Sequence, residues 1–203
     1  TNIKVSKICL GTMNWGNQNT QNEGFEQMDY ALDHGVNFFD TAELYPVPAT
    51  AEKYADTERI IGNWFNKTGK RDKVVLATKI AGPGDYTAHI RTNGFSPEAI
   101  NDAVNKSLER LQTDYLDLYQ LHWPERHTNT FGVRDYKHDS GEQWQDNFNE
   151  ILHTLDGLIK AGKIRHLGIS NEKAWGTMRY LEESKNHNLP RMITIQNAYS
   201  LLN

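Results

Sequence analysis

The chain has 203 residues, 37% of them hydrophobic, which is enough to bury a substantial core and fits one domain better than two. A formal net charge of -4, with the 22 Lys and Arg residues scattered along the chain, argues against a nucleic-acid-binding protein. One cysteine cannot form an internal disulfide, and no stretch has the pattern of a signal peptide or of a spanning helix, so we expect a cytoplasmic protein with no membrane partner.

The first half of the chain alternates apolar runs with helical patterns. The first predicted strand is residues 7–13, and Cys9 in its apolar centre is expected to be a buried thiol. A helix begins near Gly24 and ends at Gly35, because a glycine just past a helix supplies the left-handed residue that closes the last turn. The next elements are a strand, a helix and a strand, at residues 36–40, 57–67 and 73–79.

The second half continues the alternation. Ser96 followed by Pro97 gives the third helix a cap and a first-turn residue, the clearest helix start in the chain. A strand (115–122), a helix carrying apolar positions from 151 to 159, a strand (164–169), a helix (172–185) and a strand (192–196) follow. In the last helix we expect Trp175, Met178 and Leu181 to face inward.

Six predicted strands alternating with five predicted helices indicate a parallel sheet, either a (β/α) barrel or a doubly wound sheet. No Gly-x-Gly-x-x-Gly follows any strand, which disfavours a Rossmann cofactor site. A complete eight-fold barrel needs about 250 residues, two strands more than this chain offers. The carboxyl terminus is therefore expected to be truncated, with the first and sixth strands left as open, apolar edges.

Four side chains with proton-transfer chemistry lie at or just after the ends of three successive predicted strands: Asp40, Tyr45, Lys79 and His122. The carboxyl ends of parallel strands meet at one edge of the sheet, with neighbouring strands about 4.8 Å apart. Joint placement of these groups predicts an enzyme active site at that edge.

The chemistry of these groups suggests their roles. Tyr45 is the proton donor, and an ammonium about 4 Å away would lower the pKa of its phenol by roughly three units before desolvation is subtracted. Lys79 supplies that ammonium, and Asp40 keeps Lys79 ionised despite burial. His122 can donate a ring N–H that orients a substrate carbonyl.

None of these side chains can deliver a reducing equivalent, so a reductase here requires a nicotinamide cofactor. Ser170 and Asn171 at the tip of the fifth strand, with Gln196 at the tip of the sixth, offer polar groups for its amide.

Each assignment has a simpler alternative. Asp40 and Lys79 could form a structural ion pair, Tyr45 could be an ordinary loop aromatic, and His122 could be a satisfied polar residue. Ser170 and Asn171 could simply cap a helix. A metal site is not expected, because His122 and His127 lack a third partner at ligand spacing.

The sequence resembles the aldo-keto reductases, and parts of it are most similar to one bacterial branch of that family. The matching stretches are residues 11–13, 40–45, 77–79, 116–124, 168–171 and 196–202. The resemblance implies a TIM-type (β/α)8 barrel, here with about six of its eight βα units in one domain over residues 1–203. It also implies NADPH-dependent reduction of aldehydes or ketones to alcohols.

The same resemblance assigns site residues. It gives the catalytic roles to Asp40, Tyr45, Lys79 and His122, and implies that Ser170, Asn171 and Gln196 hold the nicotinamide carboxamide. It places Gly11, Thr12, Met13 and Asp40 near the nicotinamide ribose. The family's seventh and eighth strands, its nicotinamide-stacking aromatic and its basic 2′-phosphate site have no counterpart in these residues.

A long loop, residues 123–145, leaves the same strand end as His122 and is expected to shape the substrate pocket. Six aromatic residues could line an apolar mouth, or could pack on their own scaffold: Trp15, Tyr86, Trp123, Phe131, Tyr136 and Trp144. The expected partner is a small carbonyl compound, and the oligomeric state stays open. The alternative functions are a nucleotide-binding regulatory or interaction protein on the same barrel, and an inactive fragment.

Overall fold

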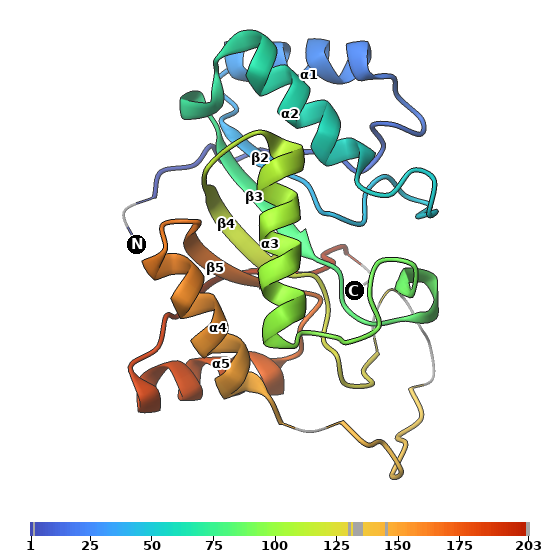
Figure 1. The fold of residues 1–203 in the computed structure, drawn as a ribbon, viewed down its shortest axis with the longest axis vertical. Coiled ribbons are helices and arrows are strands. Elements are labelled where there is room, and N and C mark those ends of the chain that lie inside the picture. Colours follow the sequence, from blue (N-terminus) through green and yellow to red (C-terminus); the bar gives the residue numbers. More distant parts are fainter. Residues whose placement is uncertain (2, 130, 132–135, 145, 202–203) are drawn as a thin grey trace.

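The computed structural model describes residues 1, 3–129, 131, 136–144 and 146–201. At its centre lies a six-stranded parallel sheet in which each strand pairs with the next one along the chain. The strands are β1 (Cys9–Gly11), β2 (Phe38–Asp40), β3 (Val75–Ile80), β4 (Leu116–Leu121), β5 (Ile164–Ser170) and β6 (Met192–Gln196). The sheet curls into a half-barrel, as expected for part of a (β/α)8 barrel (Figure 1).

Helices alternate with the strands along the chain: α1 (Gln21–Asp33), α2 (Asp56–Thr68), α3 (Pro97–Leu111), α4 (Phe148–Lys160) and α5 (Ala174–His187). Two short 3-10 turns, η1 (Arg71–Lys73) and η2 (Asp85–Thr87), flank β3. In Figure 1, α3 crosses in front of the sheet, with α1 and α2 above it and α4 and α5 below.

Local signals set the helix starts. Ser96 caps α3 as predicted, because its hydroxyl accepts the Ala99 N–H at 3.2 Å. The start of α1 lies earlier than predicted, because Thr20 and Glu23 form a capping box in which Glu23 accepts the Thr20 N–H at 2.7 Å. The sixth strand matches its prediction at both ends.

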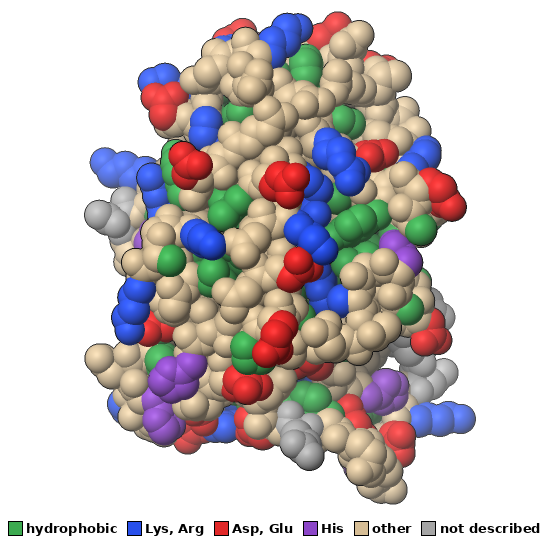
Figure 2. Space-filling model, viewed as in Figure 1, with side chains coloured by type: hydrophobic (Ala, Val, Ile, Leu, Met, Phe, Trp, Pro, Cys, Tyr) green, Lys and Arg blue, Asp and Glu red, His purple; other side chains and the backbone are tan. Residues whose placement is uncertain are grey.

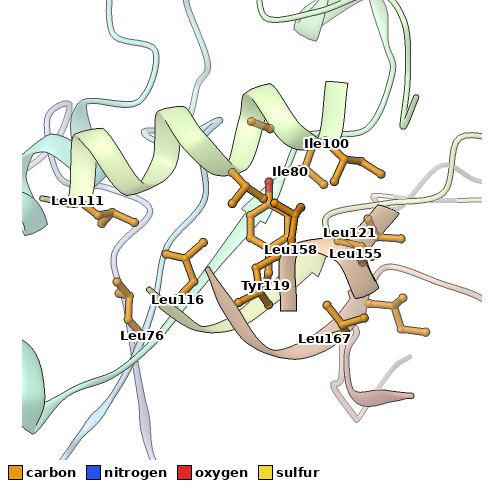
Figure 3. Packing of buried hydrophobic residues seen from close by; sticks show 14 of the residues in the cluster. Leu76, Ile80, Ile100, Leu111, Leu116, Tyr119, Leu121, Leu155, Leu158 and Leu167 are labelled. Atoms are coloured by element: carbon orange, nitrogen blue, oxygen red, sulfur yellow. The ribbon is translucent and has the colours of Figure 1, made fainter. Parts of the chain in front are cut away.

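The main core lies between the sheet and the helices, as Figure 3 shows for the side chains beneath α3. Leu76 and Ile80 of β3, Leu116 of β4 and Ile100 of α3 are all 0% exposed. Burying an aliphatic side chain of this size stabilises the fold by about 1.5–3 kcal/mol. This layer therefore supplies a rigid support for the strand ends.

The inward face of α5 differs from the prediction. Trp175 and Met178 are 53% and 62% exposed, Leu181 is half-buried, and the buried residues are Gly176, Tyr180 and Ser184. A Cβ at position 176 would lie 2.4 Å from Glu172 and 2.5 Å from Arg126, so a small residue is needed there. The sequence pattern favours the large apolar stripe, whereas the stripe with the glycine is the one that packs inward.

The prediction for Cys9 is also wrong, because this thiol is exposed. The two sheet edges are β1 and β6, as predicted, so β1 is covered by a strand on one side only. A hollow of about 510 Å³ between β1 and α1 includes Cys9, Ile8 and Tyr30 in its lining. The apolar run that contains Cys9 would suit a central strand, but it forms an edge strand of the sheet.

Charged side chains of both signs are intermingled on the face shown in Figure 2. Helical pairs such as Lys106–Asp102, at 2.9 Å, are half-exposed, and pairs of this kind contribute at most about 0.5 kcal/mol each. Within the described part of the chain, no helix combines the length and the apolar character needed to cross a bilayer.

Candidate active site

The structure brings the four predicted proton-transfer side chains together at the carboxyl edge of the sheet. Asp40 ends β2, Lys79 is the penultimate residue of β3, and His122 directly follows β4. Lys79 Nζ lies 2.6 Å from Asp40 Oδ2 and 5.1 Å from the centre of the Tyr45 ring. The rings of Tyr45 and His122 meet edge to face, with their centroids 5.6 Å apart.

Lys79 is 1% exposed and is held as part of a buried ion pair. Its ammonium also donates to the Thr41 carbonyl at 2.8 Å. The Asp40 carboxylate accepts further hydrogen bonds from the side-chain amides of Gln120, at 3.2 Å, and Gln196, at 3.3 Å. Because both charges have several partners, burial is tolerated and the ammonium is fixed beside the Tyr45 ring.

The Tyr45 phenol does not have the lowered pKa that we expected. Burial raises its pKa and the Asp40 carboxylate raises it further, while the Lys79 ammonium lowers it without reversing the net direction. The expectation counted the nearby cation and gave too little weight to desolvation. As a result the phenol keeps its proton at neutral pH, which is the state that a proton donor needs.

His122 is a neutral imidazole. Burial, assisted by the Lys79 ammonium, holds its pKa well below the ordinary value of 6.5. Its ring is 5% exposed and contacts the Trp123 ring, with centroids 4.9 Å apart. Among the residues that the structure describes, its Nδ1 finds no hydrogen-bond partner. Buried nitrogens normally have partners, so this nitrogen is an exception within the site.

A cavity of about 790 Å³ opens above these groups. Seven predicted site residues line it: Met13, Tyr45, Lys79, His122, Ser170, Asn171 and Gln196. Most of its other lining residues are Leu44, Val47, Tyr86, Phe131 and Ala198, which give the mouth an apolar character. The volume is within the range of sites for small ligands.

The six aromatic residues divide between the two arrangements that the sequence left open: two line the cavity and four do not. Tyr86 and Phe131 line the cavity, and Trp123 is buried behind them, 5.6 Å from Tyr86 and 5.4 Å from Phe131 between ring centroids. Trp123, Trp15, Tyr136 and Trp144 are not among the lining residues. Loop residues 130, 132–135 and 145 lie outside the described residues.

Three of these four aromatics pack away from the cavity. Trp15 is buried against α1 and donates to Gln27 Oε1 at 2.9 Å. Trp144 contacts the Phe148 and Trp175 rings, and Tyr136 stacks on His127.

Polar groups gather where β5 and β6 end. The Ser170 hydroxyl donates to the Gln196 carbonyl at 2.9 Å, and the Asn171 side chain donates to the His122 carbonyl, also at 2.9 Å. Asn171 has a left-handed backbone, with φ at 54°, which turns the chain toward the cavity mouth. These hydroxyl and amide groups form a polar wall of the cavity, and groups of this chemistry are compatible with a carboxamide.

The segment Gly11, Thr12 and Met13 lies beside Asp40. Gly11 pairs with Asp40 in the β1–β2 ladder, and the buried Thr12 hydroxyl donates to the Asp40 carbonyl at 2.9 Å. Met13 reaches the cavity. A Cβ at Gly11 would meet no atom within 4 Å, so this side of the strand is open.

Two groups of residues at the site were missed by the sequence reasoning. Gln120 is 2% exposed and its amide donates both to Asp40 and to Gln196, so it joins the ion pair to the polar wall. Glu43 and Arg91 form a buried pair beneath the loop that carries Tyr45, residues 41–47, called the Tyr45 loop below. The sequence features that could have pointed to these residues are a polar amide in the apolar run 115–122 and a carboxylate within the stretch from Asp40 to Tyr45.

The sequence of this chain is similar to the sequences of known proteins along almost its whole length. The Aldo/keto reductase family model matches residues 7–203. Protein tas of Escherichia coli is 45% identical over 214 residues, covering 100% of this chain and 59% of its own length. The uncharacterized oxidoreductase YrpG of Bacillus subtilis is 36% identical, covering 100% of this chain and 56% of its own length. Norsolorinic acid reductase B of Dothistroma septosporum is 28% identical, covering 98% of this chain and 47% of its own length.

This chain therefore spans 59% or less of the length of each of these relatives. The family match nevertheless extends across nearly the whole chain and includes every strand of the half-barrel. The chain belongs to the aldo/keto reductase family of oxidoreductases.

Proposed function

We propose that the protein is an NADPH-dependent oxidoreductase that reduces aldehydes or ketones to alcohols, with Tyr45 as the general acid. The observation that carries this proposal is a protonated, buried phenol beside an ammonium and a neutral imidazole on the wall of one apolar cavity. Such a set can polarise and protonate a carbonyl oxygen.

The bound cofactor would supply the hydride that the carbonyl carbon receives. Ser170, Asn171 and Gln196 would hold its carboxamide, and Met13 would border it on the β1 side. His122 would donate its N–H to the carbonyl oxygen and orient it, and Tyr45 would transfer its proton to that oxygen. The phenolate left on Tyr45 would then be reprotonated from solvent.

Lys79 acts most strongly when charge develops on Tyr45. Two opposite charges at about 4 Å attract by roughly 4 kcal/mol at an effective dielectric near 20. The neutral phenol gains little from the ammonium, whereas the forming phenolate gains most of this energy. The interaction therefore favours the transition state over the ground state, which is the requirement for catalysis.

A Tyr45→Phe variant of the protein tests the proposal. With a reactive aromatic aldehyde, loss of a general acid should lower kcat by about 10²- to 10⁴-fold, followed as NADPH oxidation. NADPH affinity, measured by fluorescence titration, should change little, because the variant keeps the ring. Unchanged turnover would remove Tyr45 as the acid.

Tyr119→Phe is the matched control. It deletes another buried tyrosine hydroxyl, one that packs beneath α3 (Figure 3) and has no hydrogen-bond partner among the described residues. Its turnover should equal that of the parent protein. Tight NADPH binding without turnover of any carbonyl in a broad panel would favour the regulatory alternative instead.

A further inference from the structure

We propose that Glu43 is a positioning residue, whose buried carboxylate, clamped by Arg91, fixes Tyr45 relative to Lys79. The expected effect on catalysis rests on the proposed function. The expected effect on the position of the loop rests on the loop geometry alone. Glu43 is 0% exposed and lies two residues before Tyr45.

Glu43 joins the Tyr45 loop to β3 at two points. Its backbone N–H donates to the Lys79 carbonyl at 3.2 Å. Its side-chain Oε1 accepts the Ala81 N–H at 2.7 Å. Residues 79 and 81 lie on either side of the strand end, so one residue ties the loop to the segment that carries the ammonium. The position of Tyr45 over Lys79 depends on this connection.

The carboxylate is fully engaged from the other side. Both terminal nitrogens of Arg91 donate to it, Nη1 to Oε1 and Nη2 to Oε2, the latter at 2.7 Å. The Tyr54 hydroxyl donates to Oε2 at 3.1 Å. The Arg91 side chain is 7% exposed, so the pair is shielded from solvent. A planar guanidinium bound through two nitrogens fixes the direction of the carboxylate as well as its distance.

Stability alone gives a weak reason for such a pair, because the cost of desolvating two charges can exceed their attraction. Tyr45 also belongs to a small apolar cluster, with Ala42, Leu44, Ala81 and Trp123, that is separate from the main core. The main core therefore does not hold this loop directly. Orientation of the loop is the role that the Glu43–Arg91 pair is placed to serve.

A second buried pair offers an internal comparison. Glu58 is also 0% exposed, and it accepts from Arg110 Nε at 2.7 Å and from the Thr78 hydroxyl at 2.6 Å. It links α2, α3 and β3 and has no hydrogen bond to residues 40–45. The two pairs share a neighbour, Tyr54, but only Glu43 reaches the Tyr45 loop.

The test compares the Glu43→Ala and Glu58→Ala variants of the protein. Each removes a buried carboxylate and leaves an arginine unpaired, so both should lower the melting temperature. Only Glu43→Ala should lower kcat, by about 10- to 100-fold, because small displacements of a reacting group are costly. NADPH affinity should be unchanged in both variants.

Hydrogen exchange gives a readout that does not need turnover. In Glu43→Ala, the amides of residues 41–45, 47 and 81 should exchange about tenfold faster than in Glu58→Ala, at equal global stability. If Glu43→Ala does not fold, Glu43→Gln should show a smaller effect in the same direction, because its amide oxygen can still accept the Ala81 N–H.

The outcomes separate the two proposals. Equal kcat losses in the two alanine variants, or equal protection of residues 41–47, would overturn the positioning role. If the parent protein turns over no carbonyl, the proposed function fails and the exchange comparison alone decides whether Glu43 fixes the loop.

Discussion

Both ends of the sheet bury a carboxylate beside a cation, and the two groups differ in what surrounds them. At the amino end, Asp117 of β4 binds Arg71 and Arg165, each at 2.8 Å, and accepts the Leu76 N–H at 3.0 Å. The two guanidinium groups lie 4.0 and 3.7 Å from the centre of the Tyr115 ring. At this end the charges join three consecutive strands and their connections.

At the carboxyl end, the Asp40–Lys79 pair lies beside groups that border a cavity. The Tyr45 phenol and the His122 ring face the cavity, and His122 Nδ1 is without a partner in the described structure. A charge cluster enclosed by strands and their connections stabilises the sheet, whereas a cluster beside a cavity can also act on a ligand. Burial of charge alone therefore does not identify a site; a cavity beside the buried charges does.

The largest effect should come from breaking the carboxyl-end pair. Lys79→Met removes the charge that stabilises a phenolate while keeping an unbranched side chain. We expect kcat for carbonyl reduction to fall by about 10³-fold, within the range for loss of acid catalysis. The measurement is NADPH oxidation under saturating cofactor, with far-ultraviolet circular dichroism to show that the fold is kept. A variant that retains a tenth of the parent rate would contradict this role of Lys79.

Breaking the amino-end cluster should lower stability without lowering kcat. Asp117→Asn leaves Arg71 buried without its counter-charge, and removal of one partner of a buried pair costs about 3–5 kcal/mol. We expect a loss near the lower limit, about 3 kcal/mol, because the Arg165 side chain is 53% exposed and can be solvated. Urea unfolding measures the loss, and kcat should be unchanged.

Asp102→Asn is the control for this variant. Its pair with Lys106 is 54% exposed on both sides, so the change should cost less than about 0.5 kcal/mol. An Asp117→Asn variant that is as stable as the parent but slower in turnover would reverse our assignment of the two ends.

Features set by local sequence were predictable. The Ser96–Pro97 helix start, the limits of β6 and the placement of Asp40, Lys79 and His122 at strand ends follow from turn residues and apolar runs. The parallel order of the sheet follows from the alternation of strands and helices. These inferences needed no knowledge of which distant residues meet.

Features set by distant contacts were not predictable. Arg91 meets Glu43 across 48 positions, and Gln120 meets Asp40 across 80. The inward face of α5 depends on room that Arg126 and Glu172 leave beside Gly176. The raised pKa of Tyr45 depends on the depth of its burial. In each case the outcome depends on a distance between residues or on the exposure of a side chain, and neither can be read from the residue type.

Each end of the sheet has a histidine whose pKa is lowered, so stability should depend on pH. This is the smallest of the effects that we expect. Burial lowers the pKa of His122 well below 6.5, so below that pH the unfolded chain binds a proton that the native ring does not. Native stability should therefore fall on acidification, by about 1.4 kcal/mol for each pH unit below about 6, as long as the native ring stays neutral. Urea unfolding from pH 7 to pH 5 should show this loss in the parent and not in His122→Asn.

His166, at the amino end on β5, has a pKa lowered chiefly by desolvation, but it is only half-buried. Solvent can reach its ring, so His166→Asn should remove much less of the acid sensitivity than His122→Asn does. The ratio of the two differences then measures how much more strongly the carboxyl end excludes water. Equal pH dependence in the parent and in His122→Asn would mean that the native ring accepts a proton, and that a ligand would meet an imidazolium at the cavity rather than a neutral donor.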